Sequence, residues 1–396
     1  MNKKKESKVV PNVRFKGFTD DWKQRKLTEI VNRVNKSSNS DVLPKVEFED
    51  IVSGEGRLNK DISSKFDSRK GTLFEPENIL YGKLRPYLKN WLFSDFEGVA
   101  LGDFWVFEAT DVSVPSFDYY LIQSDDYQKV ANDTSGTKMP RSDWKNVSST
   151  DFAIPSKDEQ KQIGAFFKQL DDTITLHQQK ITLLIKLKKA MLEKMFPKKG
   201  TVIPEFRFNG FANAWEQQKF SELYARSSEK NDGSIGMDKN ITVAIMQFKN
   251  DVKVSTTEYL KTYYTFKLGD IAFEGHQSKE FRYGRFVEND IGNGIVSHIF
   301  AVFRPIQEYD LYFWKYAINN EALMQRILAR STKASTMMHD LVTNDFLNET
   351  FLVPSVKEQK QIGAFLNKLD NLITLHQRKL DMLKKLKSAC LSEMFI

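Results

Sequence analysis

The chain has 396 residues, a length that predicts two or three domains. Lysine and arginine exceed aspartate and glutamate by 7, a mild basic excess that favours an anionic partner. A single cysteine excludes a disulfide framework and a thiolate zinc site, and it suits a reducing compartment. No signal sequence is recognisable, and no apolar run approaches the roughly 18–20 residues that cross a bilayer. We therefore expect a cytoplasmic, multi-domain protein that does not enter a membrane.

The sequence contains two copies of one unit. Residues 159–196 and 358–395 align without a gap at a separation of 199 positions, and 24 of their 38 positions are identical. A weaker repeat precedes each segment, because the 23 residues from Pro11 and from Pro204 share 10. Each copy is therefore a variable part followed by a shared segment. The predicted domains are 1–157 (first variable domain), 158–199 (central helix), 200–357 (second variable domain) and 358–396 (C-terminal helix).

Both variable domains are predicted to mix strands with helices. Short runs of β-branched and aromatic residues indicate the strands. In chain order, the predicted strands span 78–81, 104–107, 242–246, 270–273 and 299–303. A helix is predicted late in each domain, over 117–130 and 311–329, and leads into a loop rich in serine, threonine and lysine.

Each shared segment is predicted to be one long helix, because apolar residues recur every three or four positions and no proline interrupts them. Its 38 residues would make a rod of about 57 Å. Such a helix must bury its apolar seam, and the other copy is the obvious partner. We expect an α+β fold in which two pseudo-symmetric mixed α/β domains are joined by two long helices that form an antiparallel coiled coil. The predicted helix-pairing residues are Ile163, Phe167, Leu170, Ile174, His177, Ile181, Leu184, Ile362, Leu366, Leu369, Ile373, His376, Leu380 and Leu383.

Sequence signatures of catalysis are nearly absent. The chain has no G-x-x-x-x-G-K-[ST] loop, no G-x-G-x-x-G motif, and no Asn/Asp-Pro-Pro-aromatic motif of an amino-methyltransferase. Residues 159–161 and 358–360 match the E-x-K half of a nuclease site, but the acidic first turn of a helix accounts for them better. The 5 histidines show no metal-ligand spacing. We expect no catalytic residue, metal or cofactor in this chain.

A basic, aromatic loop follows one predicted strand in each variable domain. Arginine and lysine suit phosphates or guanine edges, and glutamine, histidine and tyrosine can read bases. The alternative is a solvated basic loop with an aromatic anchor. The candidate DNA-binding residues in these loops are Tyr81, Lys83, Arg85 and Lys89 in the first domain, and His276, Gln277, Lys279, Arg282, Tyr283 and Arg285 in the second.

A second loop in each domain carries hydroxyl and ammonium groups that suit phosphate contacts. N-capping of the following element is the alternative. The candidate DNA-binding residues here are Ser135, Thr137, Lys138 and Arg141 in the first domain, and Lys333, Ser335 and Thr336 in the second.

The order of these segments resembles the specificity subunit of type I restriction–modification systems. The resemblance rests in part on the motif Ser135-Gly-Thr137. The second copy differs at this motif, where it has Ala334-Ser-Thr336. The others are the Pro-x-x-x-Glu-Gln-x-x-Ile stretches within 154–163 and 353–362, and the Phe-x-Gly-Phe-x-x-x-Trp openings at Phe15 and Phe208. The resemblance covers essentially the whole chain.

This resemblance implies a non-catalytic, sequence-specific DNA-recognition subunit. Each variable domain would read one half of a bipartite, asymmetric target in double-stranded DNA, while the paired helices set the spacing and bind two modification subunits. Adenine methylation with S-adenosylmethionine, and type I endonuclease activity with ATP and Mg, would belong to the modification and restriction subunits. The alternatives are a self-contained nuclease or methyltransferase with degenerate motifs, and a coiled-coil adaptor with two heads not directed at DNA.

Overall fold

The computed structural model of the protein describes residues 9–65, 68–134, 139–249, 256–335 and 338–396. It comprises two compact units, Met1–Gln179 with Gln377–Ile396, and Lys180–His376. Each unit combines one variable domain with part of each shared segment. The predicted boundaries at 157, 199 and 357, which separate domains from helices, stay a prediction.

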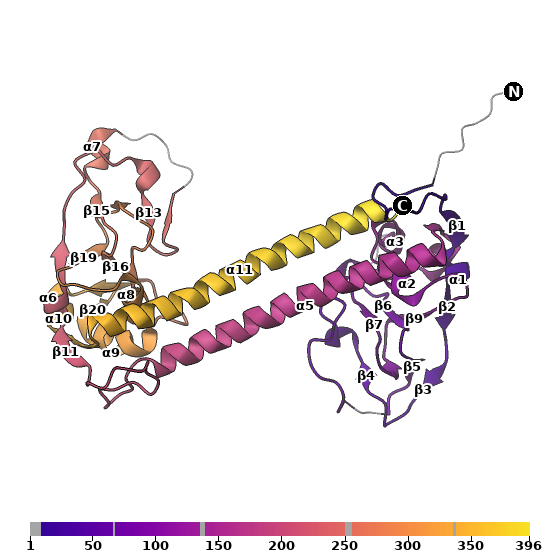
Figure 1. Ribbon diagram of the computed structural model, residues 1–396, viewed down its shortest axis with the longest axis horizontal. Helices are drawn as coiled ribbons and strands as arrows, with labels where there is room; N and C mark the ends of the chain where they lie inside the picture. The colour runs from indigo at the N-terminus through magenta and orange to yellow at the C-terminus, as the bar shows by residue number, and fades with distance from the viewer. Residues whose placement is uncertain (1–8, 66–67, 135–138, 250–255, 336–337) are drawn as a thin grey trace. The chain divides into compact units, whose positions relative to one another are not determined.

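The shared segments form two long helices, α5 (Lys157–Lys194) and α11 (Val356–Met394) (Figure 1). Both begin two residues after a proline, Pro155 or Pro354, and both carry glutamate in the first turn, where a negative charge favours the helix N-terminus. No proline follows within either helix, so the backbone hydrogen bonds continue unbroken.

Within each unit the two helices run antiparallel. In the first unit the end of α11 lies beside the beginning of α5 (Figure 1), and Lys387 pairs with Asp171 at 2.7 Å. The second unit repeats this ion pair between Lys188 and Asp370, at 2.6 Å. These residues are equivalent in the two copies, at the separation of 199 positions. The predicted fold class is confirmed.

In its described residues, the first head (23–154) contains two four-stranded sheets and one extra strand pair. The first sheet has the antiparallel order β2 (Val31–Val34), β9 (Phe104–Ala109), β6 (Ile79–Gly82) and β7 (Trp91–Phe93). The second has the order β3 (Ser37–Ser38), β5 (Gly71–Phe74), β8 (Gly98–Ala100) and β4 (Lys45–Val46), and only its last pair is parallel. Strand β1 (Lys23–Lys26) pairs with β10 (Asp151–Ile154), which leads into α5.

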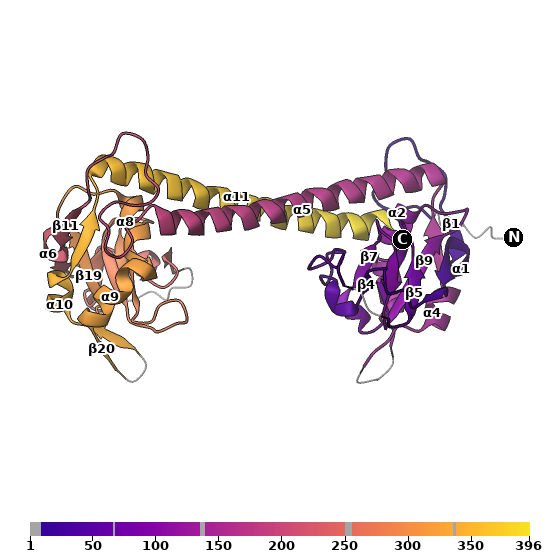
Figure 2. The ribbon, with the colours of Figure 1, turned by 90° about the horizontal axis from the view of Figure 1, so that it is seen from below.

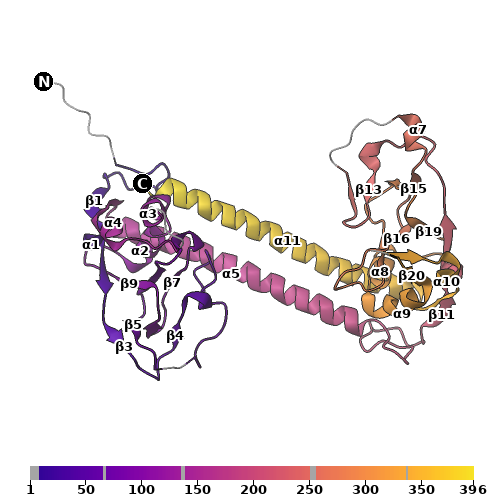
Figure 3. The same cartoon turned by 180° about the vertical axis from the view of Figure 1, so that it is seen from behind.

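Short helices cover one end of this head, and β3, β4 and β5 lie at the other end (Figure 3). They are α1 (Leu27–Ile30), α2 (Pro115–Leu121), α3 (Asp125–Ala131) and α4 (Trp144–Ser149). The helix predicted over 117–130 is therefore wrong as one element. It divides because Ser124 caps α3: its side chain accepts a hydrogen bond from the backbone N–H of Tyr127.

The second head, residues 216–353, repeats this plan. Its main sheet has the antiparallel order β12 (Tyr224–Ser227), β19 (Ala301–Pro305), β16 (Ile271–Glu274) and β17 (Arg285–Glu288). Strand β11 (Glu216–Lys219) pairs with β22 (Thr350–Val353), which leads into α11. The other pairs are β13 (Ile241–Thr242) with β14 (Gln247–Phe248), β15 (Tyr264–Phe266) with β18 (Gly294–Val296), and β20 (Thr332–Ala334) with β21 (His339–Leu341).

Two predictions for the second head are wrong. The helix predicted over 311–329 divides at Asn320, which caps the second of its two parts. The strand predicted over 242–246 ends at Thr242, because the following residues turn back to pair β13 with β14. The helices of this head are α6 (Phe220–Leu223), α7 (Thr257–Leu260), α8 (Leu311–Ile318), α9 (Glu321–Ser331) and α10 (Thr343–Asn348).

The core of each head is completed by the long helix of the other copy. Phe395, just after α11, is buried in the first head, where its ring lies 5.4 Å from that of Phe117. The equivalent Phe196, just after α5, is buried in the second head, 5.6 Å from Phe313. Each head therefore needs both copies of the repeat for a complete core.

Candidate nucleic-acid interface

The structure brings the two candidate loops of the first head together. We call residues 83–89 and 139–142 the first junction. An isolated antiparallel bridge joins Leu84 to Arg141. The N–H of Arg85 donates to the carbonyl of Pro140 at 2.7 Å, and the N–H of Ser142 donates to the carbonyl of Lys83 at 2.9 Å. Two loops that are far apart in the sequence therefore present one surface.

The cations of the first junction differ in their availability. Arg85 and Lys89 are exposed and hold left-handed backbone angles, with φ of 47° and 54°, on either side of a short 3₁₀ turn. Lys83 and Arg141 both face Asp103, at 3.8 and 3.1 Å. Because Asp103 already compensates these two cations, Arg85 and Lys89 are better placed to meet a phosphate or a base.

Tyr81 does not belong to this surface, so its prediction as a DNA contact is wrong. Only 1% of the residue is exposed, and its ring packs against Trp105 and Tyr127. Burial raises the pKa of Tyr81 to about 12. The residue lies within β6 rather than in the loop, on the face of the strand that meets the helices.

The second head contains the same arrangement. We call residues 275–285 and 338–341 the second junction. A bridge joins His276 to Met338, and the N–H of His339 donates to the carbonyl of Gly275 at 2.8 Å. A Cβ on Gly275 would lie 2.1 Å from the carbonyl oxygen of His339, so only glycine permits this approach. Strand β20 leads to this junction on the side of the head opposite α11 (Figure 2).

The second junction exposes cations and hydrogen-bonding groups. Lys279 and Arg282 are exposed, as are His276, Gln277 and, on the adjoining strand β20, Lys333. Polar and cationic side chains of this kind suit both phosphates and base edges. The hydroxyl of the exposed Ser335 is held by a hydrogen bond to the carbonyl of Met338, at 3.0 Å.

Two other predicted contacts of the second junction make interactions within the head, and their role as DNA contacts stays a prediction. Arg285 is partly buried and bonds to Glu274 at 2.7 Å and to the carbonyl of Ala244. Tyr283 packs edge-on against the ring of His339, at 5.4 Å, and against the core of the head. Both side chains support the loop rather than face outward. The predicted contacts Ser135, Thr137, Lys138 and Thr336 lie outside the described residues.

Sequence reasoning missed two residues that organise the junctions. Asp103 follows β8 and compensates the cations of the first junction, and His339 bonds to Gln277 in the second. No local motif marks either residue. Their role depends on a bridge between distant segments, which only the folded chain reveals.

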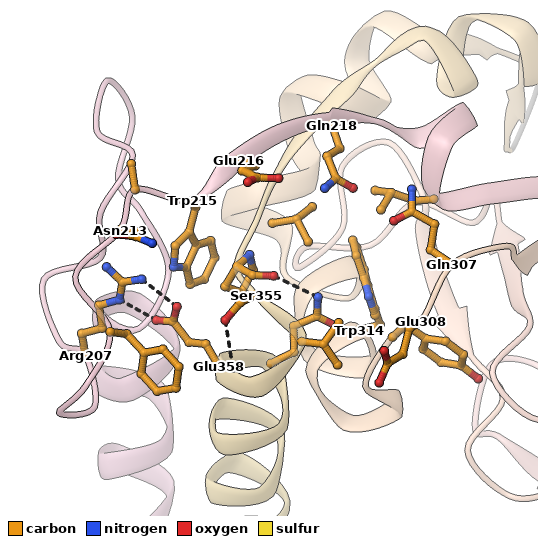
Figure 4. Close-up of a pocket in the computed structure, with 18 of the residues that line it drawn as sticks. Arg207, Asn213, Trp215, Glu216, Gln218, Gln307, Glu308, Trp314, Ser355 and Glu358 are labelled. Atoms are coloured by element: carbon orange, nitrogen blue, oxygen red, sulfur yellow. Dashed lines mark hydrogen bonds and ion pairs between the residues drawn. The ribbon is translucent and has the colours of Figure 1, made fainter.

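The acidic starts of the long helices hold the opening motifs of the two copies. In the pocket of about 390 Å³ in Figure 4, Arg207 donates two hydrogen bonds to Glu358, at 2.6 and 2.7 Å. Arg14 and Glu159 repeat this pair with the same distances. Both glutamates have side chains only 1% exposed. The E-x-K resemblance is thus explained by a structural ion pair.

The predicted seam residues occupy two environments. Ile163, Phe167, Ile362 and Leu366 pack into the cores of the heads, and these cores also contain residues at the end of the other long helix. The ring of Phe167 lies 6.0 Å from that of Phe395, and the role of these four residues in helix pairing stays a prediction. Of the remaining positions, Leu170, Ile174, Leu184, Leu369 and Leu380 are buried, and His177, Ile181, Ile373, His376 and Leu383 are partly exposed.

A second apolar stripe lies on the outer face of each long helix. Leu176, Leu183 and Leu187 of α5 are 64%, 61% and 41% exposed. Their spacing of seven and four residues places them on one face, about 200° around the helix from Ile174. The equivalent residues of α11, Leu375, Met382 and Leu386, are 46%, 63% and 47% exposed.

Each unit carries one copy of the resulting patch. The first unit has Met382 and Leu386, one turn apart on α11, which we call the first outer patch. The second unit has the equivalent Leu183 and Leu187 on α5, the second outer patch.

The described residues contain no group of three or more histidine, cysteine, aspartate or glutamate side chains that could hold a metal ion. Within the same ranges, every helix is too short or too polar to cross a membrane.

A family model for the type I restriction modification DNA specificity domain matches the chain twice, over residues 19–186 and 193–385. The type I restriction enzyme MjaVIII specificity subunit of Methanocaldococcus jannaschii is 23% identical over 270 residues, which cover 64% of this chain and 63% of that protein. The HindI specificity subunit of Haemophilus influenzae is 27% identical over 190 residues, covering 44% and 41%. These matches span less than two thirds of either relative. The crystal structure of a type I restriction-modification system S subunit from M. genitalium has the same fold, with a TM-score of 0.63 at 12% identity, covering 98% of this chain and 99% of that one.

Proposed function

The chain belongs to the type I restriction–modification DNA specificity family, and from this membership we propose that it is the DNA-recognition subunit of a type I restriction–modification complex. Each head reads one half of a bipartite, asymmetric target in double-stranded DNA. The single observation that carries this proposal is the repeated junction, because both heads use the same bridge to place exposed cations and polar groups on one surface.

The chemistry of the junctions supports DNA as the partner. Arg85 and Lys89 in the first head, and Lys279, Arg282 and Lys333 in the second, supply positive charge beside backbone that approaches closely. Contacts of this kind release counterions from the phosphate backbone, so binding should weaken steeply as salt is added. The side chains nearest the bridges then read base edges.

The outer patches support docking of two modification subunits. Exposed apolar groups at equivalent positions, one patch in each unit, suit two copies of the same partner surface. Restriction subunits join the assembly, and S-adenosylmethionine, ATP and Mg bind to the partners, so this chain contributes recognition without catalysis. A protein that acts on cellular DNA in this way belongs in the cytoplasm.

The recognition role can be tested by sequencing DNA methylation in cells with and without the gene for this chain. We expect one bipartite methylated motif to disappear in the deletion strain and to return with the wild-type gene. A coiled-coil adaptor not directed at DNA would leave every motif in place. Purified chain that methylated or cut DNA alone would instead establish a self-contained enzyme.

The docking role can be tested at two equivalent positions. Met382→Glu and Leu183→Glu each place a charge in one outer patch, and each should leave one modification subunit bound in place of two, because a desolvated carboxylate opposes association. The double variant should bind none. Val42→Glu is the matched control, because Val42 is 74% exposed on the first head, outside the patches. Unchanged stoichiometry in the double variant would exclude the outer patches as docking sites.

A further inference from the structure

We propose that Gln277 reads an adenine in the half-site of the second head, and that His339 is the positioning residue that sets its amide for this base. The inference rests on the proposed function, since it names the base that one head recognises. It is carried by a hydrogen bond that joins an exposed side chain to a buried one at the second junction.

The contact between these two side chains fixes the orientation of the amide. The Nε2 atom of Gln277 lies 2.9 Å from Nδ1 of His339. Because the amide nitrogen can only donate, Nδ1 accepts and the proton of the neutral ring is on Nε2. His339 is 7% exposed, whereas Gln277 projects from the surface. The buried His339 therefore fixes the orientation of the exposed amide of Gln277.

The orientation determines what the amide can still bind. One N–H is used by His339, which leaves the second N–H and the carbonyl oxygen Oε1. In the described part of the chain the amide makes no other hydrogen bond. In the major groove, adenine presents the N6 amino donor beside the N7 acceptor. The free oxygen and N–H of Gln277 match this pair, and guanine would instead oppose Oε1 with its O6 acceptor.

The supporting groups hold the pair in place. The ring of His339 meets the ring of Tyr283 edge-on at 5.4 Å, and the guanidinium of Arg282 lies 5.7 Å from the centre of that tyrosine ring. The backbone bond from His339 to Gly275 anchors the histidine to the loop that carries Gln277. A reader supported in this way loses little entropy on binding.

The surrounding shape fits the major groove. Strands β20 and β21 form a two-stranded ribbon that ends at the junction, and the major groove admits such a ribbon. The exposed Lys279 lies in the same loop as Gln277 and the exposed Lys333 lies on β20, so both can contact phosphates while Gln277 faces the bases.

The test is selection of duplex DNA from a randomised pool by the assembled complex of this chain with its modification subunits. Wild type should select an A·T pair at one position that Gln277→Ala no longer distinguishes, with a loss of about tenfold to a hundredfold in discrimination there. The rest of the motif should remain. Gln307→Ala is the matched control, because Gln307 is an exposed glutamine of the same head that bonds to the carbonyl of Glu222.

The role of His339 needs a readout that packing alone would not move. His339→Leu should relax the same base pair, and adding Gln277→Ala to it should cause no further loss. His339→Asn, whose amide oxygen can accept near the position of Nδ1, should restore the preference. If leucine relaxed the position and asparagine failed to restore it, the positioning role would be wrong.

The outcomes separate this inference from the proposed function. The half-site of the first head serves as an internal control for folding and assembly in every variant. A wild-type complex that selects no bipartite motif would contradict the proposed function. A bipartite motif that Gln277→Ala leaves unchanged, or relaxes at a pair other than A·T, would overturn only the role of Gln277.

Discussion

The two junctions share a backbone and differ in the side chains that it carries. The residue after the bridge is Arg85 in the first head and Gln277 in the second. The buried residue on the opposite loop is Ser142 in the first head, where its hydroxyl bonds to the carbonyl of Ala131, and His339 in the second, where it bonds to Gln277. Such a scaffold fixes where the reading side chain stands and leaves its identity free. Base preference can therefore change by substitution without a change of fold.

A second pair of equivalent loops differs in what it contacts. In the first unit the carboxylate of Glu55 accepts hydrogen bonds from Gln178 of α5 and Lys384 of α11, at 3.0 and 3.1 Å. The equivalent turn of the second head, between β13 and β14, carries Ile245, which is 62% exposed and lines a cleft of about 1380 Å³ with Leu192 of α5. At this point the first head is tied to the helices by polar contacts, and the second head borders a cleft.

The largest effect is expected from the aromatic residues that complete the two cores. Phe395→Ala should destabilise the first unit, and Phe196→Ala the second, by about 3–5 kcal/mol each, because a buried ring is lost. Hydrogen exchange of peptides from each head can measure both. Phe206→Ala is the control, since Phe206 is 40% exposed and should change protection little. If one substitution reduced protection from hydrogen exchange equally in both heads, the idea that each aromatic residue completes the core of one head would be contradicted.

The buried ion pairs at the helix starts provide the next test of equivalence. Arg14→Ala should cost the first unit about 3 kcal/mol, and Arg207→Ala the second unit a similar amount, because each leaves a buried glutamate unpaired. Urea unfolding followed by exchange in each unit can measure the loss. Arg25→Ala removes an exposed pair with Glu29 and should cost less than about 1 kcal/mol. A small loss of stability for only one of the two substitutions would show that the ion pairs do not contribute equally to the two units.

The comparison of the junctions is sharpened by exchanging their reading residues. Gln277→Arg should change the preference of the second head from A·T to G·C at one position, a difference of about 1–3 kcal/mol, because arginine bonds to guanine O6 and N7. The reciprocal Arg85→Gln should lose preference without gaining adenine, because Ser142 cannot orient an amide as His339 does. Selection of DNA by the assembled complex measures both. Retention of A·T by Gln277→Arg would contradict the comparison.

The repeat and the helices could be predicted from the sequence because their signals are local and periodic. The seam residues Leu170 and Leu369 recur at helical spacing, and the prolines before each helix mark its start. Both positions are buried in the structure. The division of the predicted helix at Ser124 was missed, because an N-cap and a mid-helix serine look alike without the backbone around them.

The candidate interface was predicted only in outline. The basic loops were found, since charge and glycine cluster there, but the bridge between Leu84 and Arg141 depends on contacts between distant segments. The wrong prediction for Tyr81 follows from the position of the end of β6. Tyr81 stands two residues before Lys83, yet one is a core residue and the other reaches the surface. A sequence pattern does not locate the last residue of a strand to that accuracy.

The smallest predicted effect concerns one position in the main sheets. Phe93 packs against Tyr119 in the first head, at 5.3 Å between rings, whereas the equivalent Glu288 is buried in the second head. Burial raises the pKa of Glu288 well above 4.5, and the nearby Asp290 and Asp310 add to this effect. The folded state therefore keeps a proton that the unfolded state releases, so the second unit loses stability as the pH rises above about 4.5.

Glu288→Gln removes this titration and should stabilise the unit by about 1–2 kcal/mol at pH 8, with the gain vanishing towards pH 4.5. Thermal unfolding between pH 5 and 8 can measure the trend, with the exposed Glu308→Gln as control. A gain that did not depend on pH would show that Glu288 is ionised in the folded protein.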